Sequence, residues 1–132
     1  MINLNKNLLL RFPLIVILLV HSVLGMFNGG INDFGNMYLN LIGFAPFGVY
    51  LAWIIKLSHV VLAICLVFDK YTKIPIMLNI MILITGIFMI HIKEGWFVVG
   101  GGSNGVEFNF LLIFVLLYLF FQNKNSHTDQ KS

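Results

Sequence analysis

The stretch FGVYLAWIIKLSHVVLAICLVF, residues 47–68, decides the fold class of this chain. At about 1.5 Å of rise per helical residue it is long enough to cross a bilayer core of about 30 Å. In lipid, backbone polar groups must be satisfied within a helix or a closed barrel, and the stretch lacks the period-two alternation of barrel strands. It therefore predicts a transmembrane helix that carries three polar side chains, Lys56, Ser58 and His59.

The composition extends this interpretation to the whole chain. Of its 132 residues, 59% are hydrophobic and 10% are charged, and the mean hydropathy is +0.94. A soluble domain is about 25% charged, and one this short has too much surface to hide so many apolar side chains from water. Lipid is therefore the expected solvent and partner. The lone cysteine, Cys65, excludes an intramolecular disulfide and a C-x-x-C redox pair.

Three further apolar stretches, residues 8–27, 74–92 and 106–121, are also expected to cross the bilayer. The last is short, so it must lie steeply, thin the bilayer or gain a turn from the preceding loop. We predict an all-α integral membrane bundle of four transmembrane helices in one domain, residues 1–121, followed by a polar tail, residues 122–132.

The basic residues indicate how this bundle is oriented. By the positive-inside rule, both termini and the short loop between the second and third stretches face the cytoplasm of a bacterial inner membrane. The net charge of +3 thus marks topology, and no nucleic-acid partner is expected. Lys93 falls outside and Lys56 within a span. The six cations on the cytoplasmic side are Lys6, Arg11, Lys70, Lys73, Lys124 and Lys131.

The first stretch has an alternative interpretation as a secretory signal peptide. Lys6 and Arg11 precede it, and Val23-x-Gly25 loosely resembles a small-residue cleavage site. Its apolar part is long for such a signal, and cleavage would discard His21. A transmembrane helix is the prediction we carry forward.

Two segments on the outer side are more than linkers. In residues 31–42, apolar side chains recur at helical spacing with Asn and Asp between them, which predicts a short helix lying in the membrane interface. In residues 93–105, Trp96 suits the headgroup level, and Gly100, Gly101, Gly102 and Gly105 make a flexible return into the last stretch.

Ionisable side chains within spans are costly and usually face the bundle interior or water, so they are the candidate binding residues. Helical rise places His91 and Glu107 within about 3 Å of the outer boundary, and His21, Lys56 and His59 about 9, 13 and 18 Å inside it. These depths predict a polar pocket that opens outward and closes near the midplane. We also predict a Lys56–Glu107 ion pair. Supporting roles are expected for Asn109 and Trp96.

Structural roles remain open for several of these residues. His91 and Glu107 could be solvated end residues, and a carboxylate at a helix N-terminus is favoured by the helix dipole without any chemical role. His21 could serve as a hydrogen-bonding group between helices.

The chemistry that fits best is a pocket for a quinone-like amphiphile, whose carbonyl accepts hydrogen bonds from His and Lys. Haem ligation by His21 and His91 is an alternative, although their depths differ by more than a helical turn.

Three histidines with Glu107 lack the local spacing of a metal site, so no metal is predicted. No constellation for nucleophilic catalysis is present, and GGGSNG lacks the strand and Gly-Lys-Ser/Thr of a phosphate loop. No cofactor is implied by a motif.

Several short motifs together resemble the DoxX family of small bacterial membrane proteins. The resemblance covers most of the chain, from about residue 8 to residue 121, and is most specific in residues 91–108. The residues that carry it are Arg11, His21-Ser22, Gly29-Gly30, Thr72-Lys73 and His91-x-x-Glu94-Gly95-Trp96-Phe97-x-x-Gly100-Gly101-Gly102-x-Asn104-Gly105-x-Glu107-Phe108.

This resemblance implies four transmembrane helices and a membrane component of a redox system, named for a quinone-linked oxidase or a thiosulfate–quinone oxidoreductase subunit. Some relatives are linked to oxidative-stress defence. By position, His21, His91 and Glu107 match the family pattern. Lys56 departs from it, because many relatives have an acid there, and Gly25 falls near a frequent lysine. No substrate or catalytic role is transferred.

Two functions remain as hypotheses. In the first, the chain is an accessory subunit, not itself an enzyme, that binds a quinone-like amphiphile for redox partner subunits. In the second, it is a non-enzymatic protein that binds lipid, transports a small solute or assists assembly. A Lys and His pair within a span is more than a passive scaffold requires, which favours the first hypothesis.

Overall fold

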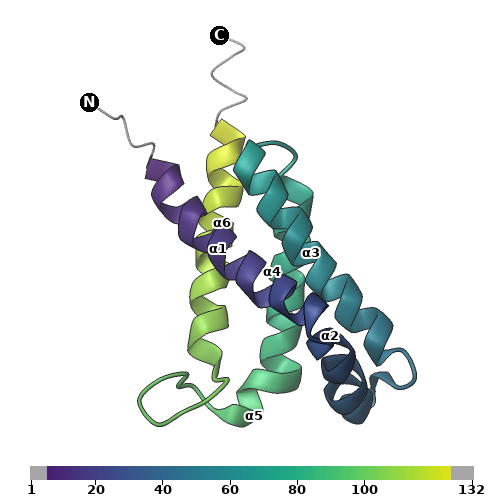
Figure 1. Ribbon diagram of the computed structural model, residues 1–132. Helices are drawn as coiled ribbons and strands as arrows, with labels where there is room; N and C mark the ends of the chain where they lie inside the picture. Colours follow the sequence, from purple (N-terminus) through teal and green to yellow (C-terminus); the bar gives the residue numbers. More distant parts are fainter. Residues whose placement is uncertain (1–5, 126–132) are drawn as a thin grey trace. The chain divides into compact units, whose positions relative to one another are not determined.

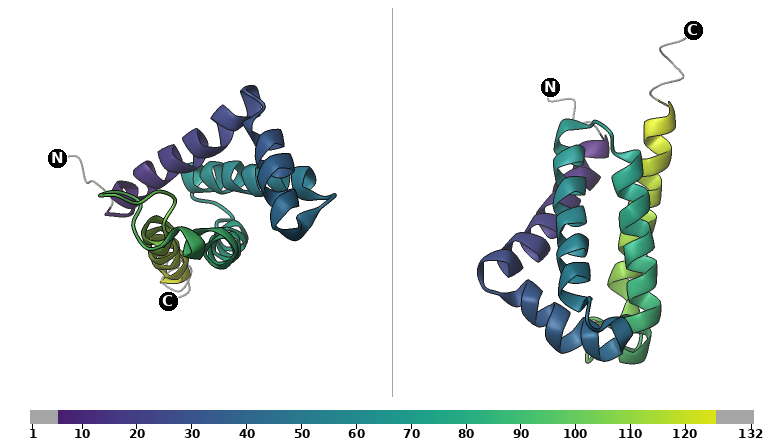
Figure 2. Two further views of the ribbon diagram at one scale, coloured as in Figure 1. Left: turned by 90° about the horizontal axis from the view of Figure 1, so that it is seen from below. Right: turned by 90° about the vertical axis from the view of Figure 1, so that its right-hand side faces the viewer.

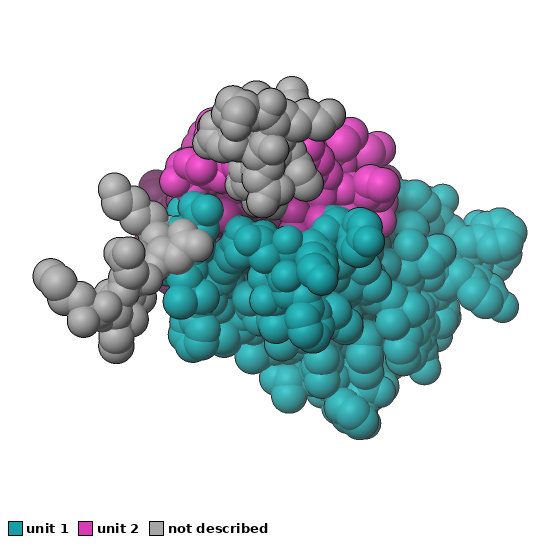
Figure 3. Space-filling view, turned by 90° about the horizontal axis from the view of Figure 1, so that it is seen from above, with its two compact units in different colours: residues 1–71 teal, residues 72–132 magenta. Residues whose placement is uncertain are grey.

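The computed structural model describes residues 6–125, and this part of the chain contains helices and no strand (Figure 1). Two compact units divide the chain, Met1–Tyr71 as unit 1 and Thr72–Ser132 as unit 2 (Figure 3). The helices of unit 1 are α1 (Lys6–Phe27), α2 (Gly30–Asp33), the π-helical η1 (Phe34–Phe44) and α3 (Gly48–Phe68). Those of unit 2 are α4 (Lys73–Gly86), the π-helical η2 (Ile87–His91), α5 (Ile92–Glu94) and α6 (Val106–Asn125).

Unit 1 is built from two long helices joined by a helical connection. α1 and α3 pack against each other, and η1 packs across α3, so the three form the sides of a triangle (Figure 2). Ile31, Leu39 and Ala52 are fully buried in the core of this unit. The indole N–H of Trp53 donates to the Asn32 side-chain oxygen at 2.9 Å, which ties α2 to α3.

Glycine permits the close approach of η1 to α3. A Cβ atom added at Gly35 would overlap the backbone of Val49, and one added at Gly48 would overlap the Gly35 carbonyl and the Asn40 side chain. The Asn40 side-chain oxygen accepts the Gly48 backbone N–H at 2.9 Å. Gly43, with φ of 117°, turns the chain at the end of η1, where a residue with a Cβ would be strained.

An ion pair joins α1 to the C-terminal end of α3. The Arg11 guanidinium donates to the Asp69 carboxylate at 2.6 Å, and the two side chains are 10% and 50% exposed. Asp69 caps α3 in the left-handed region, with φ of 54°. Arg11 therefore neutralises both a carboxylate and the partial negative charge of a helix C-terminus. This pairing of Arg11 was not predicted from the sequence.

Unit 2 is a helical hairpin in which α4, η2 and α5 follow one another without a break and α6 returns against α4 (Figure 1). The connecting loop closes through two backbone hydrogen bonds, from Val106 to the Gly95 carbonyl at 3.1 Å and from Glu107 to the Trp96 carbonyl at 3.0 Å. Gly105 lies so close to the Trp96 carbonyl that an added Cβ would overlap it.

The all-α prediction is confirmed for the described residues, and three helices are long and apolar enough to cross a membrane. Their bounds, Asn7–Phe27, Gly48–Phe68 and Lys73–Glu94, differ by at most two residues from the predicted spans. The fourth predicted span corresponds to a shorter apolar helix, Val106–Gln122. The count of four spans, the insertion into a membrane and the single domain stay predictions.

The short helix predicted over residues 31–42 is present as α2 and η1. Its position in a membrane interface stays a prediction. Most of the predicted polar tail, residues 126–132, lies outside the described residues.

Candidate functional site

Unit 1 brings together three of the five predicted binding residues. His21 comes from α1, and Lys56 and His59 lie three residues apart on one face of α3. The Lys56 Nζ donates to the His21 carbonyl oxygen at 3.4 Å. The imidazole rings of His21 and His59 meet edge to face, with centroids 6.1 Å apart and an interplanar angle of 72°. His21 of α1 therefore contacts both Lys56 and His59 of α3.

His59 is fixed by its own helix. Its Nδ1 lies 2.5 Å from the Ile55 carbonyl oxygen, and because a carbonyl can only accept, Nδ1 carries the proton. In the neutral ring the Nε2 atom is then an acceptor. His59 is 6% exposed, whereas His21 is an exposed residue. A ligand would therefore approach this cluster from the His21 side.

The ammonium of Lys56 rests on an aromatic ring. Its Nζ lies 5.7 Å from the centroid of Phe34, at the start of η1, which is within the range of a cation–π contact. Phe34 stacks in turn on Tyr38, with centroids 5.9 Å apart and planes inclined by 20°. We call His21, Lys56, His59 and Phe34 the Lys56 site. Its aromatic member was not predicted as a site residue, although helical spacing in residues 31–42 already placed Phe34 on the apolar face.

The groups that contact the Lys56 ammonium within unit 1, the His21 carbonyl and the Phe34 ring, are neutral. Among the described residues of this unit the acidic side chains are Asp33 and Asp69, and neither has an oxygen within 4.0 Å of the Lys56 Nζ. Asp69 is engaged by Arg11, and Asp33 is exposed in α2. The ammonium thus has a carbonyl oxygen and a ring face beside it in place of a carboxylate.

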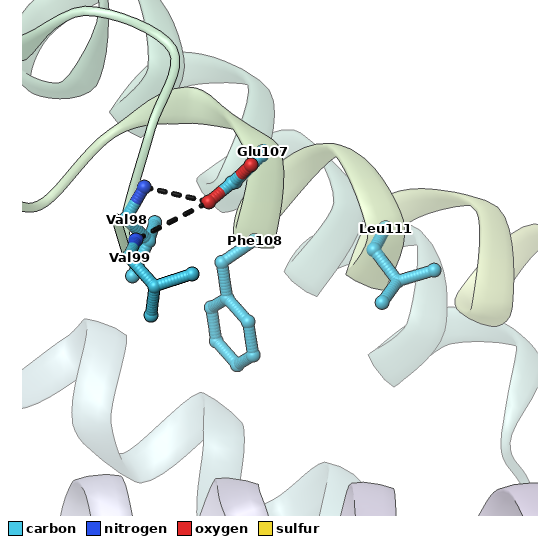
Figure 4. Close-up of a pocket in the computed structure, with 5 residues that line it drawn as sticks. All are labelled: Val98, Val99, Glu107, Phe108 and Leu111. Carbon is cyan, nitrogen blue, oxygen red and sulfur yellow. Dashed lines mark hydrogen bonds between the residues drawn. The ribbon is translucent and has the colours of Figure 1, made fainter. Parts of the chain in front are cut away.

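Glu107 closes the loop of unit 2. One carboxylate oxygen accepts the backbone N–H groups of Val98 at 2.7 Å and Val99 at 3.4 Å (Figure 4). These amides come from the loop that leads into α6, so the carboxylate and its partners are neighbours in sequence. Glu107 and Lys56 each have partners within their own unit, and the predicted Lys56–Glu107 ion pair stays a prediction.

His91 and Asn109 also gather within unit 2. The His91 Nδ1 donates to the Asn104 carbonyl oxygen at 2.5 Å, which fixes this ring to the loop. A Cβ added at Gly86 would lie 3.7 Å from the His91 ring and 3.8 Å from the Asn109 amide nitrogen, so both side chains flank this glycine. Trp96 packs on Phe110, with centroids 5.6 Å apart. The arrangement favours a structural role for these residues in holding the loop.

An apolar hollow lies beside Glu107 in the same unit. Its volume is about 310 Å³, and Val98, Val99, Phe108 and Leu111 form its walls together with Glu107 (Figure 4). The carboxylate oxygen that binds the loop amides is committed to them. The remaining walls of the hollow are apolar side chains.

Metal ligands do not gather in the described part of the chain, where no three His, Cys, Asp or Glu side chains could share an ion. The two histidines of the haem alternative, His21 and His91, belong to different units, and haem ligation by this pair stays a hypothesis. No family model, curated protein or solved structure matches the chain.

Proposed function

We propose that the chain is a DoxX-like protein of the bacterial inner membrane, with four spanning helices and cytoplasmic termini, that holds a quinone-like amphiphile at the Lys56 site. The observation that carries the proposal is the setting of Lys56, a half-buried ammonium beside a carbonyl oxygen and an aromatic face. Ionisable groups within a span usually serve a ligand or a pathway.

The geometry of the Lys56 site suits a ring that carries an oxygen. The Lys56 ammonium can donate to a quinone carbonyl, and the stacked rings of Phe34 and Tyr38 offer an aromatic wall next to it. His21 stands at the accessible side of the site. A ligand that enters there would keep its apolar tail among the exposed apolar side chains of α1, Val20 and Leu24.

The proposed role is that of an accessory subunit. Reducing or oxidising a quinone requires an electron donor or acceptor, which partner subunits would supply. The sequence resemblance in residues 91–108 supports this redox setting. In unit 2, His91 and Glu107 hold the connecting loop, so the proposal assigns ligand binding to unit 1 alone.

A lipid-binding protein is the second candidate. The apolar hollow of about 310 Å³ beside Glu107 favours it, because walls formed by Val98, Val99, Phe108 and Leu111 suit an acyl chain. This candidate places the ligand in unit 2 and leaves the Lys56 site without a role.

An extract of the purified protein separates the two candidates. We expect a quinone to co-purify from membranes in mild detergent, and the double variant Lys56→Leu, His59→Phe to lose it. The matched control is Lys93→Leu, at an exposed lysine of α5 in the other unit. Phospholipid as the sole extracted molecule would support the second candidate, and haem absorption bands would overturn both.

A further inference from the structure

The charge balance of unit 1 points to the chemistry of the ligand head. Resting on the proposed function, we infer that the quinone-like head bound at the Lys56 site carries an acidic oxygen, as the hydroxyl of a quinol does, and that it is held in its ionised form with Lys56 as its counter-ion. On binding, the O–H bond of the acid breaks, its proton passes to water, and the anionic oxygen stays beside the ammonium.

The described neighbours of Lys56 do not include an anion within unit 1. A charged group within a span is normally paired with a group of opposite charge. Lys56 has the His21 carbonyl at 3.4 Å and the Phe34 ring at 5.7 Å, and no carboxylate oxygen of the described residues of unit 1 lies within 4.0 Å. A carbonyl at 3.4 Å is a long and weak acceptor, so the described groups of unit 1 leave the ammonium under-compensated.

The titratable groups on the elements packed around α3 do not supply a free acid to Lys56 within unit 1. From α1 come His21, at the site, and Arg11, which is committed to Asp69 at 2.6 Å. α2 contributes the exposed Asp33, and η1 contributes Tyr38, which stacks behind Phe34. On α3, besides Lys56, the groups are Tyr50, His59 and Cys65. In unit 1 each described acid thus lies in solvent or in an ion pair of its own.

Two kinds of acid could provide the anionic oxygen beside Lys56. A phenol-type hydroxyl on a ring and the carboxyl of a fatty acid share an anionic oxygen joined to an apolar body. The stacked rings of Phe34 and Tyr38 beside the ammonium favour the ring, because aromatic faces add stacking to the charge pair. The edge-to-face contact between His21 and His59 holds the two imidazoles together.

The experiment uses the full chain in detergent micelles and an alkylated nitrophenol, whose phenolate absorbs visible light while its phenol does not. We expect bound probe to ionise at lower pH than probe in empty micelles, with about tenfold more phenolate at a given pH, because an opposite charge at close range lowers the pKa of an acid by about one unit or more. The methyl ether of the probe, which cannot ionise, should bind about tenfold more weakly.

Variants assign the effect to its residue. Lys56→Gln should bind the probe without the enhanced ionisation, Lys56→Arg should retain it, and Lys93→Gln should behave as wild type. A helical circular dichroism spectrum for each variant shows that it is folded. An alkyl carboxylate of equal tail length forms a second arm, and tighter binding of the phenolate than of the carboxylate identifies a ring as the occupant.

The possible failures are distinguishable. Absence of probe binding to the wild type would overturn both this inference and the proposed function. Binding with unchanged ionisation would overturn the inference and leave the proposed function standing. Enhanced ionisation that survives in Lys56→Gln would show that Lys56 is not the counter-ion.

Discussion

Arg11 and Asp69 lie 58 residues apart in the sequence, yet their side chains meet at 2.6 Å, where the first third of α1 reaches the last turn of α3. The two partners differ in their surroundings, because the Arg11 side chain is 10% exposed and that of Asp69 is 50% exposed. The buried partner therefore depends on the exposed one for compensation of its charge.

This asymmetry predicts unequal effects of two substitutions. Asp69→Asn keeps a residue that tolerates the left-handed region but leaves the Arg11 charge buried without its counter-ion, so it should lower the free energy of unfolding by about 1–3 kcal/mol. Arg11→Met removes the buried charge and should cost less. Denaturant titration in mixed micelles measures both, and a larger cost for Arg11→Met would contradict the argument.

Glu107 should protect two amide protons of the loop. In Glu107→Ala the backbone N–H groups of Val98 and Val99 lose their acceptor, and their hydrogen exchange should accelerate by about tenfold to a hundredfold, since a hydrogen bond to a charged group contributes about 1.5–3 kcal/mol. Glu107→Gln, which keeps a side-chain oxygen, should show a smaller effect. The matched control is Glu94→Ala, at an exposed residue of α5, and equal acceleration there would show that the loop responds to any loss of charge.

A methyl group at Gly35 should disrupt unit 1. Gly35→Ala places its Cβ against the Val49 backbone, which cannot move aside as a side chain can, and we expect a loss of about 1–3 kcal/mol of unfolding free energy. Gly86→Ala is the comparison, because its Cβ would make ordinary contacts of 3.7–3.8 Å. Alanine in a helix is favoured over glycine, so this variant should be unchanged or more stable by up to about 1 kcal/mol. Equal stability of the two variants would refute the close approach of η1 to α3.

Cysteine labelling tests the orientation in the membrane. The test uses a Cys65→Ser background and cells whose outer membrane has been made permeable while the inner membrane stays intact. Lys93→Cys should then react with an impermeant maleimide, because Lys93 is expected on the periplasmic side. Lys70→Cys, in the connection after α3, should react only after lysis. Both positions are exposed. The opposite pattern would reverse the orientation, and labelling of both in intact cells would refute the predicted crossing by α4.

Continuous apolar patterns predicted the helices well. The bounds of the three long apolar helices follow from where hydrophobic runs stop, at positions such as Asn28 and Asp69, and the structure places them within two residues of the prediction. The helical spacing of Ile31, Phe34 and Ile42 likewise predicted the connection between α1 and α3. What the pattern could not show is that much of this connection is π-helical, because the spacing of apolar residues does not reveal whether the backbone bonds run from i to i+5 or from i to i+4.

The candidate site was less predictable, because a linear sequence shows depth along a helix and not which residue each side chain contacts. His21, Lys56 and His59 converge as expected from their depths and faces. Depth also suggested that Glu107 was the nearest acid to Lys56, but its carboxylate binds amides nine and eight residues earlier in the chain. Arg11 and Asp69 were missed as a pair because each lies near a predicted span end, where charges need no partner.

The approach of Gly35 to Val49 also bears on the Lys56 site, because Phe34 directly precedes Gly35. Phe34, whose ring lies under the Lys56 ammonium, belongs to η1. The distance between η1 and α3 is set by contacts with the Val49 backbone, which cannot move aside as a side chain can. A larger side chain at Gly35 would push η1 away from α3 and move the Phe34 ring away from Lys56. A substitution at Gly35 should therefore change the proposed ligand binding at the Lys56 site indirectly, by displacing Phe34.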